Sequence, residues 1–465
     1  MKRWLRIIFL TVMILSFAAA CGGASSGGGD EAGETSQDQT QPTVEVAGET
    51  ALPPPVISEA EGNLEGQPPV SEEQTEQEQP AQEAEDQAQT AEGSGEEASS
   101  VEEVLQPMEP WSADDFGYGV QVHGNATVGD PADTMRTAKE SLGVDWVKMQ
   151  IQWWLVHPDP DVEQWFFYDG VVDEAHEHGL RLMVSVVGAP GWTRSDGTEN
   201  GPPDDYGQYA AFLTEMLERY DGKIDAVDVW NEQNLDREWA TANGVNPEDY
   251  VQFLQVANEA IKAYDPNIIV ISGALAPTGD GDWISWIDDF QWLDRALAAG
   301  LLDYADCVGA HHNGYNIGPD VTYEEAPSDP QGATAIFRGP FDNPHHSWSF
   351  KSTLDTYAEK VQAIDPTKKL CVTEFGWASS EGYDSYPTGF EFAQDNTLQE
   401  QADFITQAFQ QMHDSGDVWL AYLFNFDFGN KGSGPEDDPV PYSIIDIQGI
   451  PRPAFEALAN MEKPR

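Results

Sequence analysis

The sequence predicts an α/β protein whose folded part is a (β/α)8 TIM barrel, and three observations support that fold class. Eight short apolar runs recur between residue 111 and the end of the 465-residue chain. Longer stretches with the 3.6-residue period of amphipathic helices separate these runs. Nothing with the composition of a linker interrupts residues 111–465. Strands and helices that alternate in this number fit a closed parallel barrel better than an open sheet.

The predicted strands are short and rich in β-branched and aromatic residues. They are Tyr118–Val122, Trp146–Ile151, Leu180–Val187, Ala226–Trp230, Ile268–Ser272, Cys307–Ala310, Leu370–Thr373 and Val418–Asn425. The first run is the weakest, and the count of eight depends on accepting it. Three of the intervening segments have a helical period, namely Tyr206–Arg219, Asp249–Tyr264 and Ser352–Ile364.

Residues 1–20 have the pattern of a secretory signal peptide. Basic residues precede a short apolar run, and three alanines stand directly before Cys21 and two glycines. The run is too short for a comfortable membrane span. The Ala-Ala-Ala-Cys sequence resembles a bacterial lipobox, which implies cleavage before Cys21 and lipidation of its thiol. We therefore expect an exported protein, lipid-anchored to the outer face of a bacterial membrane. The alternative is a plain secreted protein with an unrelated cysteine.

Residues 21–110 are predicted to be a disordered, acidic, low-complexity linker. The segment is rich in Gly, Ser, Gln, Glu, Pro and Thr, and residues 22–110 contain no Lys, Arg or aromatic residue. Such a composition cannot bury enough apolar surface to offset the entropy lost on ordering. Repulsion between its charges should extend it beyond a Gly/Ser coil of the same length. We interpret it as a stalk for the domain formed by residues 111–465.

The formal net charge of -60 argues against several classes of partner. Nucleic acid binding is not expected, because no basic patch is available to neutralise phosphates. Strongly anionic polysaccharides are also disfavoured as substrates, unless Lys and Arg cluster locally. A saline habitat would explain the charge, but the sequence does not identify one.

Cys307 and Cys371 are the only cysteines besides Cys21. Each lies inside an apolar run, where small buried cysteines are common. We expect buried free thiols, and a disulfide between neighbouring strands is the alternative. The sequence has no CxxC motif and no Cys/His spacing typical of zinc sites.

Polar and aromatic residues gather where the predicted strands end, which is the active-site end of a (β/α)8 barrel. Glu232 in VWNEQN follows the fourth strand, and Glu374 in VTEFGW follows the seventh. These strands lie on opposite sides of a barrel, so the two side chains can face each other. Glycoside hydrolysis needs such a pair, one carboxylic acid and one carboxylate. A rim glutamate in a surface salt bridge is the plain alternative for either residue alone.

The segments VWNEQN, followed by LDREW, and KKLCVTEFGW resemble those of clan A glycoside hydrolases, most of all family 39 and its cellulase-like neighbour family 5. The resemblance covers roughly residues 115–460 and includes the tail YSIIDIQGIPRPAFEAL. It implies a retaining β-glycosidase with Glu232 as the acid/base and Glu374 as the nucleophile. It also implies that Asn231 binds the sugar 2-hydroxyl and that His311 and Tyr315 support the sugar and the nucleophile.

Three positions depart from the family pattern. Tyr315 lies four residues after His311, whereas His-x-Tyr is usual, and Lys148 stands where many relatives have Arg. The eighth strand offers Phe424, Asn425 and Phe426 instead of a Trp platform. We expect Lys148 to keep Glu374 ionised. We expect burial and the charge of Glu374 to raise the pKa of Glu232, so that this residue is protonated near neutral pH.

Other residues near the strand ends are candidates for sugar binding. Trp192 and Trp377 directly follow strand ends and are the favoured sugar platforms, with core packing as the alternative, and His123 follows the first strand. Residues 317–346 form a long connection that we expect to line a cleft, where Arg338 or His346 could reach a sugar.

A paired-histidine metal site is set aside, because adjacent residues on a strand point in opposite directions. Its members would be His311, His312, His345 and His346. The proposed reaction needs no metal ion, so we expect no metal site and no cofactor.

The sequence therefore predicts a surface-tethered retaining β-glycosidase that acts on an extracellular polysaccharide or oligosaccharide. Two alternatives are a non-catalytic carbohydrate-binding lipoprotein and a structural protein of the cell envelope on the same barrel. We expect a monomer held to the membrane through Cys21. The sugar, the linkage and the choice between endo and exo action do not follow from the sequence.

Overall fold

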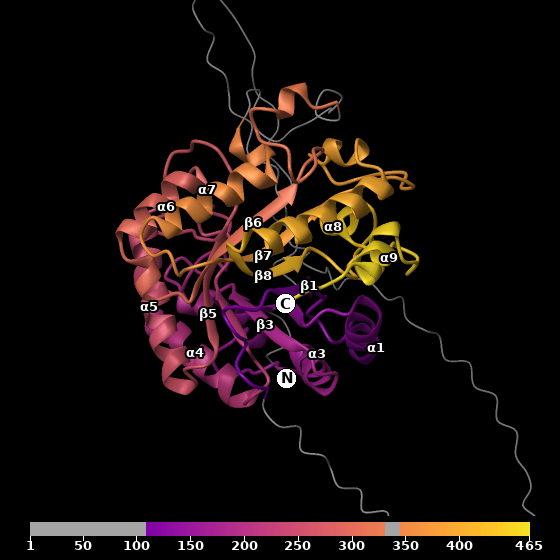
Figure 1. Cartoon of the computed structure of the whole chain (residues 1–465). Helices are drawn as coiled ribbons and strands as arrows, with labels where there is room; N and C mark the ends of the chain where they lie inside the picture. Colours follow the sequence, from indigo (N-terminus) through magenta and orange to yellow (C-terminus); the bar gives the residue numbers. More distant parts are fainter. Residues whose placement is uncertain (1–107, 331–344) are drawn as a thin grey trace, which may run out of the picture. The chain divides into compact units, whose positions relative to one another are not determined.

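A computed structural model describes residues 108–330 and 345–465, and Figure 1 shows their helices arranged around a barrel of strands. The predictions for the signal peptide, for Cys21 and for most of the linker fall outside these residues, as does Arg338. Among the described residues, no helix combines the length and the apolar character that a membrane span requires.

The barrel is closed and parallel, which confirms the predicted fold class. Its strands are β1 (Gly117–Gln121), β2 (Trp146–Gln152), β3 (Arg181–Val187), β4 (Ala226–Val229), β5 (Ile269–Leu275), β6 (Cys307–Gly314), β7 (Leu370–Trp377) and β8 (Val418–Leu423). Each strand pairs with the next, and β8 pairs with β1. Strands β6 and β7 continue beyond their predicted ends, so His311 and Glu374 lie inside strands and not after them.

The helices lie outside the strands (Figure 1). They are α1 (Pro131–Arg136), α2 (Trp153–Val156), α3 (Phe166–Glu177), α4 (Tyr206–Arg219), α5 (Pro247–Tyr264), α6 (Asp289–Ala298), α7 (Phe350–Gln362), α8 (Leu398–Ser415) and α9 (Pro453–Asn460). Shorter helical turns are η1 (Thr137–Leu142), η2 (Gly191–Thr193), η3 (Leu301–Asp303), η4 (Ala326–Ser328), η5 (His346–Trp348), η6 (Glu391–Gln394) and η7 (Val440–Tyr442). The three predicted helices correspond to α4, α5 and α7.

Helix α8 illustrates how the sequence sets the ends of these elements. Thr397 accepts a hydrogen bond from the backbone N–H of Glu400, and the Glu400 carboxylate accepts one from the N–H of Thr397. This capping box satisfies two backbone donors that the first turn leaves without partners. The helix ends at Gly416, whose φ of 74° is a conformation that glycine adopts without strain.

Two apolar clusters surround and fill the barrel. The larger one joins the strands to the helices, and a smaller one lies apart from it. The members of the smaller cluster come mostly from the strands, and they include Trp146, Met183, Ile271, Leu420 and Tyr422. The polar side chains described below therefore stand on a packed apolar layer.

Cys307 and Cys371 form a disulfide between β6 and β7, so the expectation of free thiols was wrong. The strands are adjacent, and Cys371 lies opposite Gly309, two residues after Cys307. The two Cα atoms are 5.8 Å apart, which is within the range for a disulfide. The sequence placed both cysteines on neighbouring strands, but it did not supply the register that brings their side chains together.

Candidate active site

Strand β4 ends in a turn with an uncommon backbone. Trp230 and Glu232 have φ values of 81° and 40°, in the region that non-glycine residues rarely adopt. Each such residue costs about 1–3 kcal/mol, and surrounding contacts must offset this cost. The Trp230 ring packs edge-on against Trp239 and Phe253, and its indole N–H donates to the backbone oxygen of Glu238 at 2.8 Å.

Gln233 and Asn234, the next two residues in WNEQN, tie this turn to β5 and its extension. Gln233 Nε2 donates to the oxygen of Gly273 at 2.6 Å, and Asn234 Nδ2 donates to that of Ala276 at 2.8 Å. A Cβ at Gly273 would lie 2.7 Å from the backbone oxygen of Val229 and 2.4 Å from Gln233 Oε1, so this close approach requires glycine. Both amides are therefore structural, which leaves Asn231 and Glu232 for chemistry.

Glu374 is held by a buried cation from inside the barrel. Lys148 Nζ on β2 lies 2.7 Å from Glu374 Oε1, and both side chains are buried. Burial by itself would raise the pKa of Glu374, but the charges of Lys148 and His311 outweigh that effect and hold the pKa below its ordinary value. The predicted ion pair between Lys148 and Glu374 is present, and it favours an ionised Glu374.

His311 brings the two glutamates together. Its Nδ1 lies 3.2 Å from Glu232 Oε1 and 3.9 Å from Glu374 Oε2. The two carboxylate oxygens cannot be farther apart than these two distances taken together. Two carboxylates this close can flank a single glycosidic bond. The prediction that Glu232 and Glu374 face each other across the barrel is confirmed.

Glu232 pairs closely with Arg237, from the LDREW segment. Burial raises the pKa of Glu232, but the charges of Arg237 and His311 outweigh burial and lower the pKa to about 2. The expectation that Glu232 is protonated near neutral pH was therefore wrong for this geometry. Sequence reasoning assigned no role to Arg237, because the turn that folds it back onto Glu232 leaves no pattern in the sequence.

Asn231 and Tyr315 lie in the same region as Glu232. Asn231 is buried, and within the described part of the chain its Oδ1 has no hydrogen-bond partner, which makes it available to a ligand. Burial and the nearby charge of Glu232 raise the pKa of Tyr315. The effect of the Glu232 charge on the pKa of Tyr315 shows that the two residues are near each other despite the departure from His-x-Tyr spacing, and the Tyr315 ring packs edge-on against Phe392.

His123 makes its contacts on the side of β1 and β8. Its backbone N–H lies 3.2 Å from Asp427 Oδ1, and its ring lies against Phe428. Burial lowers the pKa of His123. The nearby charge of Asp427 raises this pKa and the charge of Lys431 lowers it, and the result is a pKa below the ordinary value. His123 Nδ1 accepts from the backbone N–H of Asn125 at 3.3 Å, so a neutral imidazole can offer its Nε2–H to a sugar hydroxyl.

The two tryptophans predicted as sugar platforms differ in how exposed they are. Trp192 is 40% exposed, and its indole N–H donates to the oxygen of His157 at 2.8 Å. Trp377 is 0% exposed, packs against Phe350 and Phe404, and donates to the oxygen of Ile317. Trp377 faces the helices because of its position along β7, so the prediction that it stacks on a sugar was wrong.

Two further residues reach the site without having been predicted. Asp228 on β4 accepts a hydrogen bond from Ser185 Oγ at 2.8 Å, and burial raises its pKa to about 7 although Lys148 opposes the shift. A polar residue inside the apolar run AVDV was the signal that could have revealed it. Tyr442 is buried, its hydroxyl has no partner among the described residues, and both glutamates act on it electrostatically.

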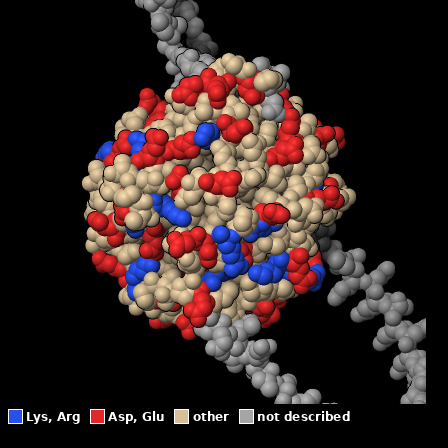
Figure 2. All heavy atoms as spheres, viewed as in Figure 1, with Lys and Arg blue, Asp and Glu red and all other residues tan. Residues whose placement is uncertain are grey.

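The outer surface in Figure 2 carries many acidic side chains, with Lys and Arg in smaller groups between them. On this face, within the part of the chain that the structure describes, no large basic patch is visible.

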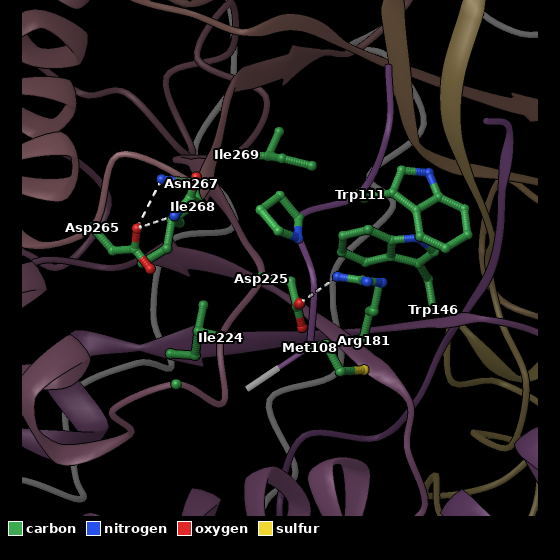
Figure 3. A pocket seen from close by; sticks show the side chains of 12 residues that line it. Met108, Trp111, Trp146, Arg181, Ile224, Asp225, Asp265, Asn267, Ile268 and Ile269 are labelled. Atoms are coloured by element: carbon green, nitrogen blue, oxygen red, sulfur yellow. Dashed lines mark hydrogen bonds and ion pairs between the residues drawn. The ribbon is translucent and has the colours of Figure 1, made fainter. Parts of the chain in front are cut away.

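A pocket at the opposite end of the barrel is separate from the two glutamates. It is lined by the first residues of β2, β3 and β5 and by the segment around Trp111 (Figure 3). Arg181 Nη1 lies 2.8 Å from Asp225 Oδ1, and the guanidinium lies over the rings of Trp111 and Trp146. These contacts pack the start of the described chain against the N-terminal ends of the strands.

Comparison with known proteins supports the fold. No family model and no curated protein matches this chain. Among solved structures, it is similar to a family 39 glycoside hydrolase from the gut symbiont Bacteroides cellulosilyticus WH2, with 18% identity and a TM-score of 0.52. That match covers 75% of this chain and 63% of the other, so this chain spans less than two thirds of that length.

A second similar structure is GH5_18 from Streptomyces cattleya in complex with GlcNAc. It has 17% identity and a TM-score of 0.51, over 76% of this chain and 83% of that one. At such identities the likeness establishes the (β/α)8 fold, which hosts many activities, and function must be argued from the site.

Proposed function

We propose that this protein is a retaining β-glycosidase that hydrolyses O-glycosidic bonds of a polysaccharide or oligosaccharide outside the cell. The observation that carries the proposal is the convergence of Glu232 and Glu374 on one nitrogen of His311. Glycoside hydrolysis with retention needs two carboxyl groups at about 5–5.5 Å, one on each side of the scissile bond. The fold shared with glycoside hydrolases of families 39 and 5 supports this reading.

The first step forms a covalent intermediate. The Glu374 carboxylate attacks the anomeric carbon, the bond from that carbon to the leaving oxygen breaks, and Glu232 donates a proton to that oxygen. In the second step Glu232 takes a proton from water, the water oxygen bonds to the anomeric carbon, and the Glu374 ester breaks. Lys148 supports both steps because it keeps Glu374 ionised as nucleophile and as leaving group.

Glu232 can serve as the acid only when it holds a proton, and Arg237 opposes that in the structure. The mechanism therefore requires that a bound sugar displaces or weakens the Arg237 contact. Carbohydrate binding without turnover is the second candidate function, and the low pKa of Glu232 is the observation that favours it.

We also propose that the chain is exported and anchored through Cys21, with the enzyme acting as a monomer. The disulfide between Cys307 and Cys371 supports this location, because disulfides persist in oxidising compartments outside the cytoplasm.

Trapping with a panel of 2-fluoro β-glycosides, followed by mass spectrometry of peptides, tests the function. We expect one sugar to label Glu374, and Glu374→Gln to lose the label and on the order of 10⁴-fold or more in kcat on aryl β-glycosides. Glu232→Ala should keep activity on substrates with good leaving groups, which need little acid assistance. Glu359→Gln, at an exposed position on α7, is the matched control and should behave like the wild type.

The outcomes separate the two candidate functions. Oligosaccharide binding measured by calorimetry, without turnover of any glycoside and without a label, would establish the non-catalytic function. A label on a residue other than Glu374, or full activity of Glu374→Gln, would overturn the assignment of the nucleophile.

A further inference from the structure

A second cluster of ionisable side chains lies where α6 and α7 begin. Asp288 and Asp289 stand at the start of α6, and His345 and His346 stand just before α7. His345 Nε2 lies 3.4 Å from Asp288 Oδ2, and His346 Nε2 lies 3.9 Å from the same oxygen. His346 Nε2 also lies 2.8 Å from Asp289 Oδ1. The structure therefore brings His345 and His346 to two carboxylates, whereas His311 faces the glutamates.

The two aspartates of this cluster are buried next to each other. Asp288 and Asp289 are adjacent in the chain and are 7% and 0% exposed. Among the described residues, the two histidines are their only ion-pair partners, and no Lys or Arg contacts them. Two neighbouring buried carboxylates are costly unless positive charge lies between them. A cation held between the histidines and the carboxylates would place positive charge at the centre of the cluster.

Surrounding groups fix the two carboxylates in position. Asp288 Oδ1 accepts from the backbone N–H of Gln291 as the cap of α6, which leaves Oδ2 facing the histidines. Tyr357 donates its hydroxyl to Asp289 Oδ2 at 2.5 Å, and the backbone N–H of Thr278 donates to Oδ1 at 2.9 Å. Ordered outer partners of this kind are typical of residues that bind metal ions.

The distances suit a small divalent ion. The candidate ligand atoms of Asp288, His345 and His346 all lie within 4.8 Å of one another. In a tetrahedral zinc site with bonds of about 2.0–2.1 Å, ligand atoms lie about 3.3–3.4 Å apart. The distances from histidine Nε2 atoms to aspartate oxygens in this cluster are 2.8, 3.4 and 3.9 Å, and they lie on both sides of that spacing. Imidazole nitrogens with carboxylates favour zinc and similar transition metals over magnesium or calcium.

The second ring nitrogen of His345 can adapt to a bound ion. His345 Nδ1 lies 3.0 Å from Ser347 Oγ and 3.2 Å from the backbone nitrogen of Ser347. When Nδ1 accepts from the backbone N–H, the ring proton is on Nε2. When Nδ1–H instead donates to Ser347 Oγ, the ring proton leaves Nε2, whose lone pair can then bind a metal ion beside Asp288.

We propose that Asp288, His345 and His346 bind one divalent transition-metal ion, Zn²⁺ by the fit of the donors, and that Asp289 completes the site. The ion ties the start of α6 to the start of α7. It shares no ligand with the candidate active site, so it is a structural site and stands independently of the proposed glycosidase function.

Equilibrium dialysis of the full mature chain, prepared without a polyhistidine tag and first stripped with EDTA, tests this proposal. Excess Mg²⁺ saturates weak carboxylate sites elsewhere on this acidic protein. We expect one equivalent of tightly bound Zn²⁺ and a higher Tm with Zn²⁺ than without it. Asp288→Asn and His345→Ala should each weaken binding by at least about tenfold. Replacement of Zn²⁺ by Co²⁺ should give the visible absorption of a site with nitrogen and oxygen ligands.

The double variant His413→Ala, Asp414→Asn is the matched control, because it removes another His–Asp pair, 2.8 Å apart, from the outer surface of α8. It should bind Zn²⁺ as the wild type does. Equal uptake by wild type and Asp288→Asn would overturn the proposal, since the ion would then sit on ordinary surface carboxylates. A wild type that binds no stoichiometric Zn²⁺ or Co²⁺ would overturn it as well, and no variant has to fold for that result.

Discussion

The ends of β4 and β7 each place a glutamate beside the same nitrogen of His311, but different contacts hold the two glutamates. Glu374 pairs with Lys148, whose side chain is 0% exposed and whose strand is part of the barrel wall. Glu232 pairs with Arg237, whose side chain is 27% exposed and lies in the loop after β4. A buried cation on a strand is fixed, whereas a half-buried cation on a loop can move. The two glutamates are therefore suited to different tasks.

The backbone is also more regular at Glu374 than at Glu232. Glu374 lies within strand β7, next to His311 on β6 in the register of the sheet. Glu232 lies in a turn with positive φ, and hydrogen bonds from Gln233 and Asn234 hold that turn. A nucleophile must stay in one place and in one ionisation state, and an acid/base must gain and lose a proton during each cycle.

Asp228 completes the charge balance below the two glutamates. Besides His311, which lies beside both glutamates, Lys148 and Arg237 bring two positive charges, and Glu232 and Glu374 bring two negative ones. Burial raises the pKa of Asp228 to about 7, so that near neutral pH about half of it is protonated and its negative charge is reduced. The comparison between β4 and β7 can be tested by removing each of these three supports in turn.

The largest effect is expected from Lys148→Met. Loss of the ammonium removes the main charge that lowers the pKa of Glu374, so this pKa should rise. The proposed nucleophile works as a carboxylate, and the acidic limb of the kcat/KM profile should therefore move to higher pH. We expect a loss on the order of 10²–10³-fold in kcat, and about 3–5 kcal/mol of stability because Glu374 stays buried without its closest cation.

Lys223→Met is the matched control for this variant. Lys223 pairs with Asp173 at 2.6 Å on the outer surface, where such pairs are worth about 0–1 kcal/mol. It should leave the pH profile of the enzyme unchanged. If Lys148→Met kept the acidic limb of the wild type, the buried ion pair would not control the ionisation of Glu374.

Asp228→Asn should have the next largest effect, and it concerns stability. The folded-state pKa of Asp228 lies above the ordinary value of 3.8, so its contribution to stability is complete below that value and is lost as pH rises to about 7. Asn cannot ionise and can still accept from Ser185. We therefore expect the variant to gain on the order of 2–4 kcal/mol relative to the wild type at pH 8, and little at pH 4.

Urea denaturation at the two pH values measures this difference. A variant that is destabilised equally at pH 4 and pH 8 would show that Asp228 acts through packing or hydrogen bonding, and not through the cost of its buried charge.

The fold and the glutamate pair were predictable because both depend on local pattern. Eight apolar runs gave the strands, and the positions of Glu232 and Glu374 after two of them gave the pair. The prediction for Trp377 rested on its place just after a predicted strand end, and it failed because β7 continues through Trp377 and its side chain packs against the helices.

The remaining features depend on contacts between distant residues. Formation of the disulfide between Cys307 and Cys371 depends on the register of β6 against β7. The ion pair of Arg237 with Glu232 depends on a turn whose φ values no residue type at those positions predicts. The pKa of Glu232 follows from that ion pair, so the error in its predicted protonation had the same origin.

The smallest effect on activity is expected from Arg237→Gln. This variant tests most directly the contrast between the cation beside Glu232 and the cation beside Glu374. Loss of the guanidinium should raise the pKa of Glu232, because Arg237 is the largest of the charges that lower it. An acid works in its protonated form, so the basic limb of the profile should move to higher pH. The kcat/KM profile reports the free enzyme and the kcat profile reports the enzyme–substrate complex.

If a bound sugar already displaces Arg237, the variant should move the basic limb of kcat/KM by about one pH unit or more, about 1.4 kcal/mol per unit, and leave the basic limb of kcat in place. Arg219→Gln removes a surface arginine paired with Asp169 and should change neither profile. Equal shifts in kcat and kcat/KM would mean that Arg237 stays on Glu232 when the sugar is bound. No shift in either would mean that Arg237 does not set the ionisation of Glu232, and the contrast between a fixed and a movable cation would fail.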